Sequence, residues 1–162
     1  MPDLTKKQAV FFALLASVVA LLGFCLVVGY QPEPEKTLLN VGGHLLNARI
    51  ADSPTELRKG LSGIRDLNES EGMLFLIPEG MKPVFHMKDV KMPLDIAFLD
   101  ENGVILDIKE ANLSDKKTFF SPPEGTLYTI EVRQGWFEKQ GIKRGDIVSP
   151  GFSLLSLKEK TL

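Results

Sequence analysis

Residues 85–100 (FHMKDVKMPLDIAFLD) bring acids and lysines together with many apolar residues. Asp95 has apolar neighbours on both sides, whereas a strand with one buried face alternates apolar and polar side chains. We therefore expect its carboxylate to be buried. Such a group costs several kcal/mol unless backbone amides hydrogen-bond it, a cation pairs with it or it is protonated. Lys88 and Arg65 are the candidate cations.

Two interpretations of Asp95 stay open on the sequence alone. In the first, its carboxylate fixes the turn before its strand by accepting amide hydrogen bonds near Pro93. In the second, Asp95 and Lys88 face a cleft, where burial beside a charge shifts pKa values as acid–base catalysis requires. The second interpretation predicts a hydrolase-like enzyme.

A metal site is a further alternative. Met81, His86, Met87 and Met92 lie close together in the sequence, and thioether and imidazole ligands favour copper(I). However, neighbouring residues of a strand point to opposite faces, so His86 and Met87 could not both bind one ion without a bulge. Methionine is also ordinary core filler, so no metal is predicted.

Several other classes of chemistry are excluded. No cysteine follows Cys25, which removes disulfides, thiol nucleophiles and thiolate metal sites from the rest of the chain. The sequence around Ser62 (LSGIR) is not the G-x-S-x-G elbow of a serine hydrolase. Because no phosphate-binding glycine motif or metalloprotease helix is present either, we expect no cofactor.

Short strands separated by turns must position these side chains. Residues 37–51 predict a hairpin around the Gly42-Gly43 pair, and residues 94–109 predict a second around Asn102-Gly103. Between them, a short helix is capped at Asp52 or Ser53 and ends at Gly60. Residues 73–77 are apolar throughout, which is typical of a central strand covered on both faces.

The C-terminal part continues this pattern. In residues 128–133, Tyr128, Ile130 and Val132 alternate with polar residues, which predicts a strand with one wet face. A helical turn follows, in which Trp136 and Phe137 are expected to close one end of the core, and then a short strand. Residues 153–157 (SLLSL) are a candidate for one more strand. The fold class is therefore mainly β, a small closed barrel or sandwich with one or two short helices.

The N-terminal region predicts a membrane anchor. Residues 9–29 are uncharged and about as long as the roughly 20 residues that cross a bilayer. Lys6 and Lys7 precede this run, which places residues 1–8 in the cytoplasm and the rest outside. A cleaved signal, which would release a secreted protein, and a lipoprotein signal at Cys25 are weaker alternatives, because the apolar run is long and Phe24 is bulky.

The organisation beyond the anchor follows from composition. Residues 30–37 contain Pro32 and Pro34 between glutamates and predict a short tether. Residues 38–162 are enough for one extracytoplasmic β domain, periplasmic or extracellular. After Lys7 the chain carries 19 − 2 basic and 21 − 1 acidic residues, because Lys6, Lys7 and Asp3 precede this point, which gives a net charge of −3. Weak acidity argues against nucleic acid as a partner.

Three blocks of the sequence resemble one known family. They are ARIADSPTELRKGLSGIRDLNESEGMLFLIP, FHMKDVKMPLDIAFLDENGVI and YTIEVRQGWFEKQGIKRGDIV, and they span about residues 46–149. In order and spacing they resemble the bacterial and archaeal domain of unknown function 192. The resemblance implies a small β-rich domain, often exported behind a signal or anchor, and no particular reaction. Family members usually show Trp-Met-Lys-Asn-Thr where this chain has residues 86–90 (HMKDV), and Met where it has Ser62. Any contact that the family makes through that Trp or Asn is therefore not expected in this chain.

The sequence thus predicts a membrane-anchored binding or accessory module of the cell envelope, with an unknown small ligand or envelope protein as its partner. The predicted ligand-binding patch consists of Arg65, Phe85, His86, Met87, Lys88 and Asp95. The alternatives are an envelope enzyme that uses Asp95 and Lys88, and a copper(I)-binding protein.

Overall fold

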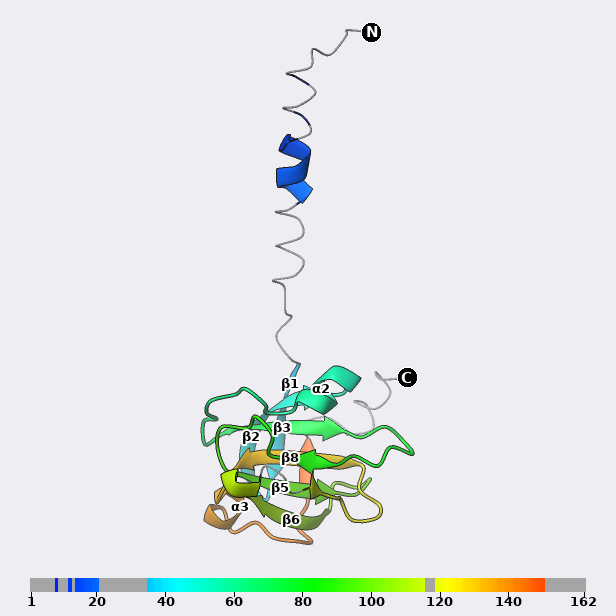
Figure 1. Ribbon diagram of the computed structural model, residues 1–162. Coiled ribbons are helices and arrows are strands. Elements are labelled where there is room, and N and C mark those ends of the chain that lie inside the picture. Colours follow the sequence, from blue (N-terminus) through cyan, green and yellow to red (C-terminus); the bar gives the residue numbers. More distant parts are fainter. Residues whose placement is uncertain (1–7, 9–11, 13, 21–34, 116–118, 151–162) are drawn as a thin grey trace. The chain divides into compact units, whose positions relative to one another are not determined.

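The computed structural model describes Gln8, Phe12 and residues 14–20, 35–115 and 119–150 (Figure 1). The chain divides into two units, Met1–Glu33 and Pro34–Leu162. In the first unit, residues 14–20 are helical. Within the described residues, no helix has the length and apolar character needed to cross a membrane. Most of the anchor predicted at 9–29, most of the tether at 30–37 and the strand suggested at 153–157 lie outside the described residues.

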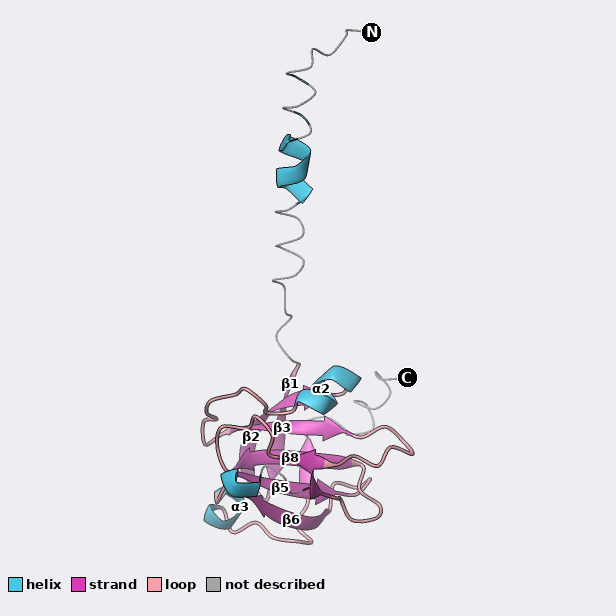
Figure 2. Cartoon of the chain, in the orientation of Figure 1, coloured by secondary structure: helices cyan, strands magenta, loops and turns pink. Residues whose placement is uncertain are grey.

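The second unit is mainly β, as predicted, and its helices are short (Figure 2). The strands are β1 (Lys36–Val41), β2 (His44–Ala51), β3 (Glu71–Leu76), β4 (Phe85–His86), β5 (Leu94–Leu99), β6 (Ile105–Ala111), β7 (Phe119–Phe120), β8 (Tyr128–Arg133) and β9 (Val148–Pro150). The helices are α2 (Pro54–Lys59), η1 (Leu113–Asp115) and α3 (Trp136–Lys139).

Seven strands form one curled sheet in the order β6-β5-β8-β3-β2-β1-β9, and β4 and β7 pair separately. Figure 1 shows β2, β3, β8, β5 and β6 following one another across the sheet. All neighbours in the large sheet are antiparallel except β2 and β3, whose parallel pairing is made possible by the connection through α2. The sheet is a half-barrel, which corrects the expected closed barrel or sandwich. The β9 strand is short. Its first residue and the residues just before it meet the start of β6 through an isolated bridge between Val104 and Ile147 and through backbone hydrogen bonds such as that from the Val148 amide to the Gly103 carbonyl.

The local turn signals are confirmed. The β1–β2 hairpin turns at Gly42 and Gly43, both with positive φ, and β5 pairs with β6 across the Asn102-Gly103 turn. Ser53 caps α2 in a capping box with Glu56. Two hydrophobic residues at the start of α3, Trp136 and Phe137, are buried as expected.

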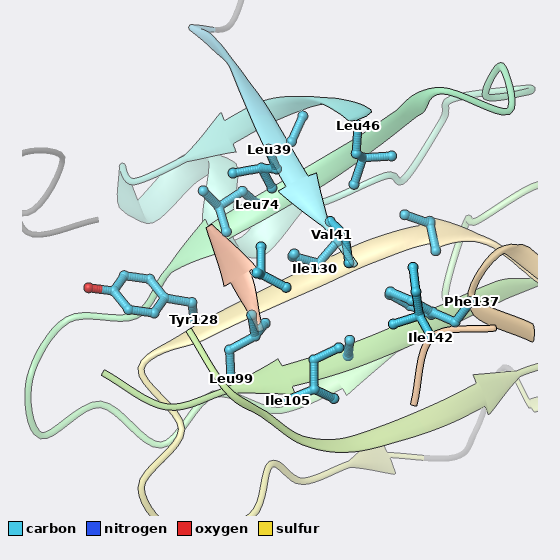
Figure 3. Packing of buried hydrophobic residues seen from close by; sticks show 14 of the residues in the cluster. Leu39, Val41, Leu46, Leu74, Leu99, Ile105, Tyr128, Ile130, Phe137 and Ile142 are labelled. Atoms are coloured by element: carbon cyan, nitrogen blue, oxygen red, sulfur yellow. The ribbon is translucent and has the colours of Figure 1, made fainter. Parts of the chain in front are cut away.

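The sheet has an apolar cluster on each face. The first cluster fills the concave side and includes Leu39, Leu74, Ile130 and Phe137 (Figure 3). The second lies on the opposite face, where α2, the 61–67 loop and the 85–92 segment cover it. Its strand residues are Met73 and Phe75 of β3, Leu94, Ile96 and Phe98 of β5, and Ala51 and Ala111 at the ends of β2 and β6.

The wet face predicted for β8 is wrong. Because β8 lies between β3 and β5, both of its faces are covered. Tyr128, Ile130 and Val132 point into the first cluster, while Thr129 and Glu131 are buried on the side of the second. A glutamate in the middle of a two-sided core therefore needs a local explanation.

A candidate ligand pocket around a buried glutamate

A pocket of about 400 Å³ opens on the face of the second cluster. Its walls come from α2 and the turn after it, from residues 81–86 and from strand residues beneath them. The lining residues are Pro54, Leu57, Arg58, Lys59, Gly60, Leu61, Ser62, Phe75, Ile77, Met81, Pro83, Val84, Phe85, His86, Val90 and Glu131. The wall is thus mostly aliphatic and aromatic, with few polar groups.

The Glu131 side chain reaches this pocket from the central strand β8. Its strand neighbours in register are Met73 on β3 and Ile96 on β5, both buried and apolar. A Cβ atom added to Gly60 would lie 3.8 Å from Glu131 Oε2 and 3.3 Å from Phe75 Cζ. The carboxyl therefore lies beneath the turn that ends α2, beside the ring of Phe75.

The Glu131 carboxyl has no hydrogen-bond or ion-pair partner among the described residues. The residue is 7% exposed, and its side chain takes part in no hydrogen bond or ion pair within the described part of the chain. Burial alone raises its pKa from an ordinary value of 4.5 to about 8. Near neutral pH the carboxyl therefore holds a proton, and it can act as a hydrogen-bond donor and acceptor or exchange its proton for a cation.

The rim of the pocket is basic and apolar. Arg58 and Lys59, at the end of α2, are exposed, and no acidic side chain of the described residues pairs with either. Met81 and Val84 are exposed on the opposite wall. Phe119, which pairs with His86 between β4 and β7, is 68% exposed but does not line the pocket. An apolar molecule that carries an anionic group would match this rim.

Aromatic rings form part of the pocket lining. Phe85 packs edge-on against Phe75 and Phe98, with ring centroids 5.4 and 5.7 Å apart. The Thr129 hydroxyl, on the same side of β8 as Glu131, is fully buried and has no hydrogen-bond partner. Two polar groups without partners thus lie two residues apart on one strand.

Only part of the predicted patch lies at this pocket. Phe85 and His86 line it, whereas Met87 is buried in the second cluster. Arg65 and Lys88 are exposed and are not among the lining residues. The backbone of the 86–90 segment is fixed by hydrogen bonds from Ser62 Oγ to the Lys88 carbonyl and from the Gly63 amide to the Asp89 carbonyl.

Asp95 belongs to a different place. It is 4% exposed, and it alternates with Leu94 and Ile96, so it points to the concave side of the sheet. Its Oδ2 accepts a hydrogen bond of 2.9 Å from the amide of Gly135, at the start of α3, and Oδ1 has no partner. Burial raises the pKa of Asp95, opposed by the amides of Gly135, Phe137 and Trp136. Neither Lys88 nor Arg65 pairs with it, so the structure does not bring together the acid–base pair of the alternative interpretation.

The residues considered for copper are also separated. His86 and Met81 line the pocket, but Met87 and Met92 are buried in the second cluster. His86 is exposed while Met87 is buried, as strand alternation predicts. No group of three or more His, Cys, Asp or Glu suited to a metal occurs among the described residues.

Ser62, His86 and Glu131 all line the pocket, and these are the residue types of a hydrolytic triad. The Ser62 hydroxyl, however, donates to the Lys88 carbonyl at 3.1 Å, and no hydrogen bond links His86 to either of the other two. The set lacks the contacts between nucleophile, base and acid that such chemistry needs.

Sequence reasoning missed Glu131 because its strand alternates like a solvated one. The available signal lay elsewhere, in residues 73–77 and 94–99, which are apolar on both faces. A polar-alternating strand inserted between two such strands must bury its polar side chains as well. Only the strand order shows that β8 is the inserted strand.

Comparisons with known proteins agree with the fold. The chain is similar to a Sinorhizobium meliloti protein described as a candidate transcription regulator, with 25% identity and a TM-score of 0.70 over 75% of this chain and 98% of that one. It is also similar to a protein of unknown function from Novosphingobium aromaticivorans, with 27% identity and a TM-score of 0.66 over 74% of this chain and 93% of that one. No curated protein matches the chain. The profile of the DUF192 family, described as "Uncharacterized ACR", matches residues 37–150, and the chain therefore belongs to this family.

Proposed function

We propose that the β domain is a binding module that takes a small ligand into the pocket above Glu131. We further propose that residues 9–29 anchor the chain in the membrane, with the domain outside the cytoplasm. The uncharged run and the two preceding lysines support the second part. The pocket geometry supports the first.

The single observation that carries the binding proposal is a buried carboxyl without a partner at the floor of an open apolar pocket. Ligand sites typically have volumes of about 300–1,000 Å³, apolar walls and a few polar groups that orient the ligand. This pocket has a volume of about 400 Å³ and fits that description. A buried acid with a raised pKa destabilises the fold, and groups of this kind cluster at functional sites.

Binding is favoured over catalysis by the contacts of the polar groups. An enzyme needs reacting groups held within hydrogen-bonding reach of one another. In this pocket Ser62 is hydrogen-bonded to a backbone carbonyl, and Glu131 makes no hydrogen bond or ion pair with another side chain of the described residues.

A thermal-shift screen tests the proposal. The full chain in detergent micelles is screened against amines, amino acids, sugars, nucleotides and cell-wall fragments. A ligand at about 100 times its dissociation constant adds roughly 2.7 kcal/mol to the stability of the domain. We expect at least one compound to raise the melting temperature of the wild type.

Two variants locate the binding. Val84→Trp places a large side chain at the pocket wall, and Leu45→Trp makes the same change on an exposed position of β2 that does not line the pocket. We expect the first variant to lose the stabilisation and the second to keep it. A screen with no hit, or a hit that Val84→Trp retains in full, would contradict the proposal.

A further inference from the structure

The pocket is lined by one acid and two strongly basic side chains, and none of these three has an ion-pair partner among the described residues. Glu131 is buried at the floor, and Arg58 and Lys59 are at the rim. We propose that the ligand is a lysine-like zwitterion, with a primary ammonium at Glu131, an alkyl stem along the apolar wall and a carboxylate at Arg58 and Lys59. A free amino acid of this kind or the last residue of a peptide carries all three groups. The inference rests on the proposed function and specifies its ligand.

A primary ammonium is the ligand group that would pair with the ionised form of Glu131. Its attraction to a buried carboxylate is stronger than in water, and this attraction must offset the cost of removing the ammonium from water. Because the pKa of Glu131 is about 8, removing its proton at pH 7 reduces affinity only about tenfold. A charge-assisted hydrogen bond is about twice as strong as a neutral one, so it can exceed this cost.

The wall suits a flexible apolar stem. Leu57, Leu61 and Phe75 belong to or pack against the second cluster, and all three line the pocket beside Glu131. Lysine side chains commonly bury their methylene groups along such surfaces while the charged end makes a polar contact. An alkyl stem would therefore remove apolar wall from water and place its terminal amine at the floor.

The rim selects the other end of the ligand. Arg58 and Lys59 are consecutive residues at the end of α2, and no carboxylate of the described residues occupies them. They repel a simple amine, and they attract a molecule whose far end is a carboxylate. The pocket thus distinguishes a zwitterion from a plain amine through charges at two ends.

The groups that face Glu131 determine how ligand affinity depends on pH. The charged or titratable side chains that line the pocket with it are Arg58 and Lys59 from α2 and His86 from β4. The neighbouring strands β3 and β5 contribute apolar side chains. Binding of an ammonium releases the Glu131 proton, so affinity should rise about tenfold per pH unit up to about pH 8 and then level off.

Titration calorimetry with three probes tests the ligand class. In all three probes the acetyl group is on the α-nitrogen. N-acetyl-lysine carries a side-chain ammonium and a carboxylate, N-acetyl-norleucine lacks the ammonium, and N-acetyl-lysinamide lacks the carboxylate. The full chain in micelles should bind the first most tightly at pH 8. From pH 6 to pH 7 its affinity should increase about tenfold.

Variants test which residues bind the ammonium and which bind the carboxylate of the ligand. Glu131→Gln should abolish the preference for N-acetyl-lysine over N-acetyl-norleucine, while Glu138→Gln, at an exposed glutamate of α3, should keep it. Arg58→Gln with Lys59→Gln should abolish the preference over N-acetyl-lysinamide. His86→Gln should retain the pH profile.

The outcomes separate this inference from the proposed function. If N-acetyl-norleucine binds as tightly as N-acetyl-lysine, or affinity for N-acetyl-lysine falls from pH 6 to pH 8, the ligand class is wrong while pocket binding stands. If no probe binds but a screening hit is lost in Val84→Trp, the ligand class is again wrong. If N-acetyl-lysine binds equally to wild type and Val84→Trp, both proposals are overturned.

Discussion

The buried acid makes the stability of the domain depend on pH in a direction opposite to that of most carboxylates. The pKa of Glu131 is raised from 4.5 to about 8 in the folded protein. Between these values the folded state holds a proton that the unfolded state has lost, so the free energy of unfolding falls as pH rises. The slope is about 1.4 kcal/mol per pH unit. Over the whole window, the difference between 8 and 4.5 multiplied by this slope gives roughly 5 kcal/mol.

Glu131→Gln removes this penalty and keeps the shape of the side chain. Near pH 4.5 the neutral acid and the amide should differ little, apart from about 1–3 kcal/mol if a buried amide hydrogen is left without a partner. At pH 9 the variant should be more stable than the wild type by several kcal/mol. Asp95 also has a raised pKa, so the variant should retain a weaker fall in stability above pH 4.

Urea unfolding at a series of pH values measures this effect. Trp136, the one tryptophan of the chain, is buried in the first cluster, so its fluorescence reports unfolding of the domain. Glu138→Gln, at an exposed position, is the control and should follow the wild type. If the free energies of unfolding of wild type and Glu131→Gln differ by the same amount at pH 5 and pH 9, burial does not raise the pKa of the Glu131 carboxyl. Titration of the Glu131 carboxyl carbon near 4.5 in an NMR experiment would refute it directly.

Three further predictions concern other parts of the chain. Asp95→Ala should destabilise the domain by about 1–3 kcal/mol because the Gly135 amide loses its acceptor. Asp95→Asn should cost less. Equal urea midpoints for Asp95→Ala and wild type would contradict this prediction. Gly72→Ala should lower the free energy of unfolding by about 1–3 kcal/mol in the same assay, because its Cβ would lie 2.8 Å from the Glu131 backbone carbonyl oxygen. An unchanged urea midpoint would contradict this prediction and show that the backbone shifts easily. The full chain should stay with membranes after alkaline carbonate extraction, and protease added to spheroplasts, whose outer barrier has been removed, should digest residues 38–162. Release by carbonate would argue against the proposed anchor, and protection from protease in spheroplasts would argue against its orientation.

The local elements could be predicted because their signals lie within a few residues. The Gly42-Gly43 and Asn102-Gly103 turns, the Ser53–Glu56 capping box and the apolar run of β3 each specify one conformation. Each of these depends on backbone freedom, capping or burial that neighbouring residues determine. The strand order has no such signal, because β8 reaches its place between β3 and β5 through long-range pairing.

The site was harder to predict than the fold. Phe85 and His86 were identified from an unusual local composition, and both line the pocket. Asp95 was correctly expected to be buried, but its partner is the Gly135 amide, which lies far along the chain. The burial of Glu131 could not be predicted locally. The apolar–polar alternation of residues 128–133 occurs both in strands with one solvent-exposed face and in this strand, which is covered on both faces. The roles of these residues in binding are predictions that the variants above test.

The place of β8 also bears on how the chain reaches its folded state. The β3 and β5 strands leave the ribosome before β8, and each must keep one edge open until residues 128–133 arrive between them. Pairing of strands so distant in sequence is slow, and open edges invite association with other chains. In a nascent chain of this protein, strand edges therefore stay unpaired until residue 133 has been made. A chaperone that shields strand edges would improve the yield, and a copy truncated before residue 128 would aggregate.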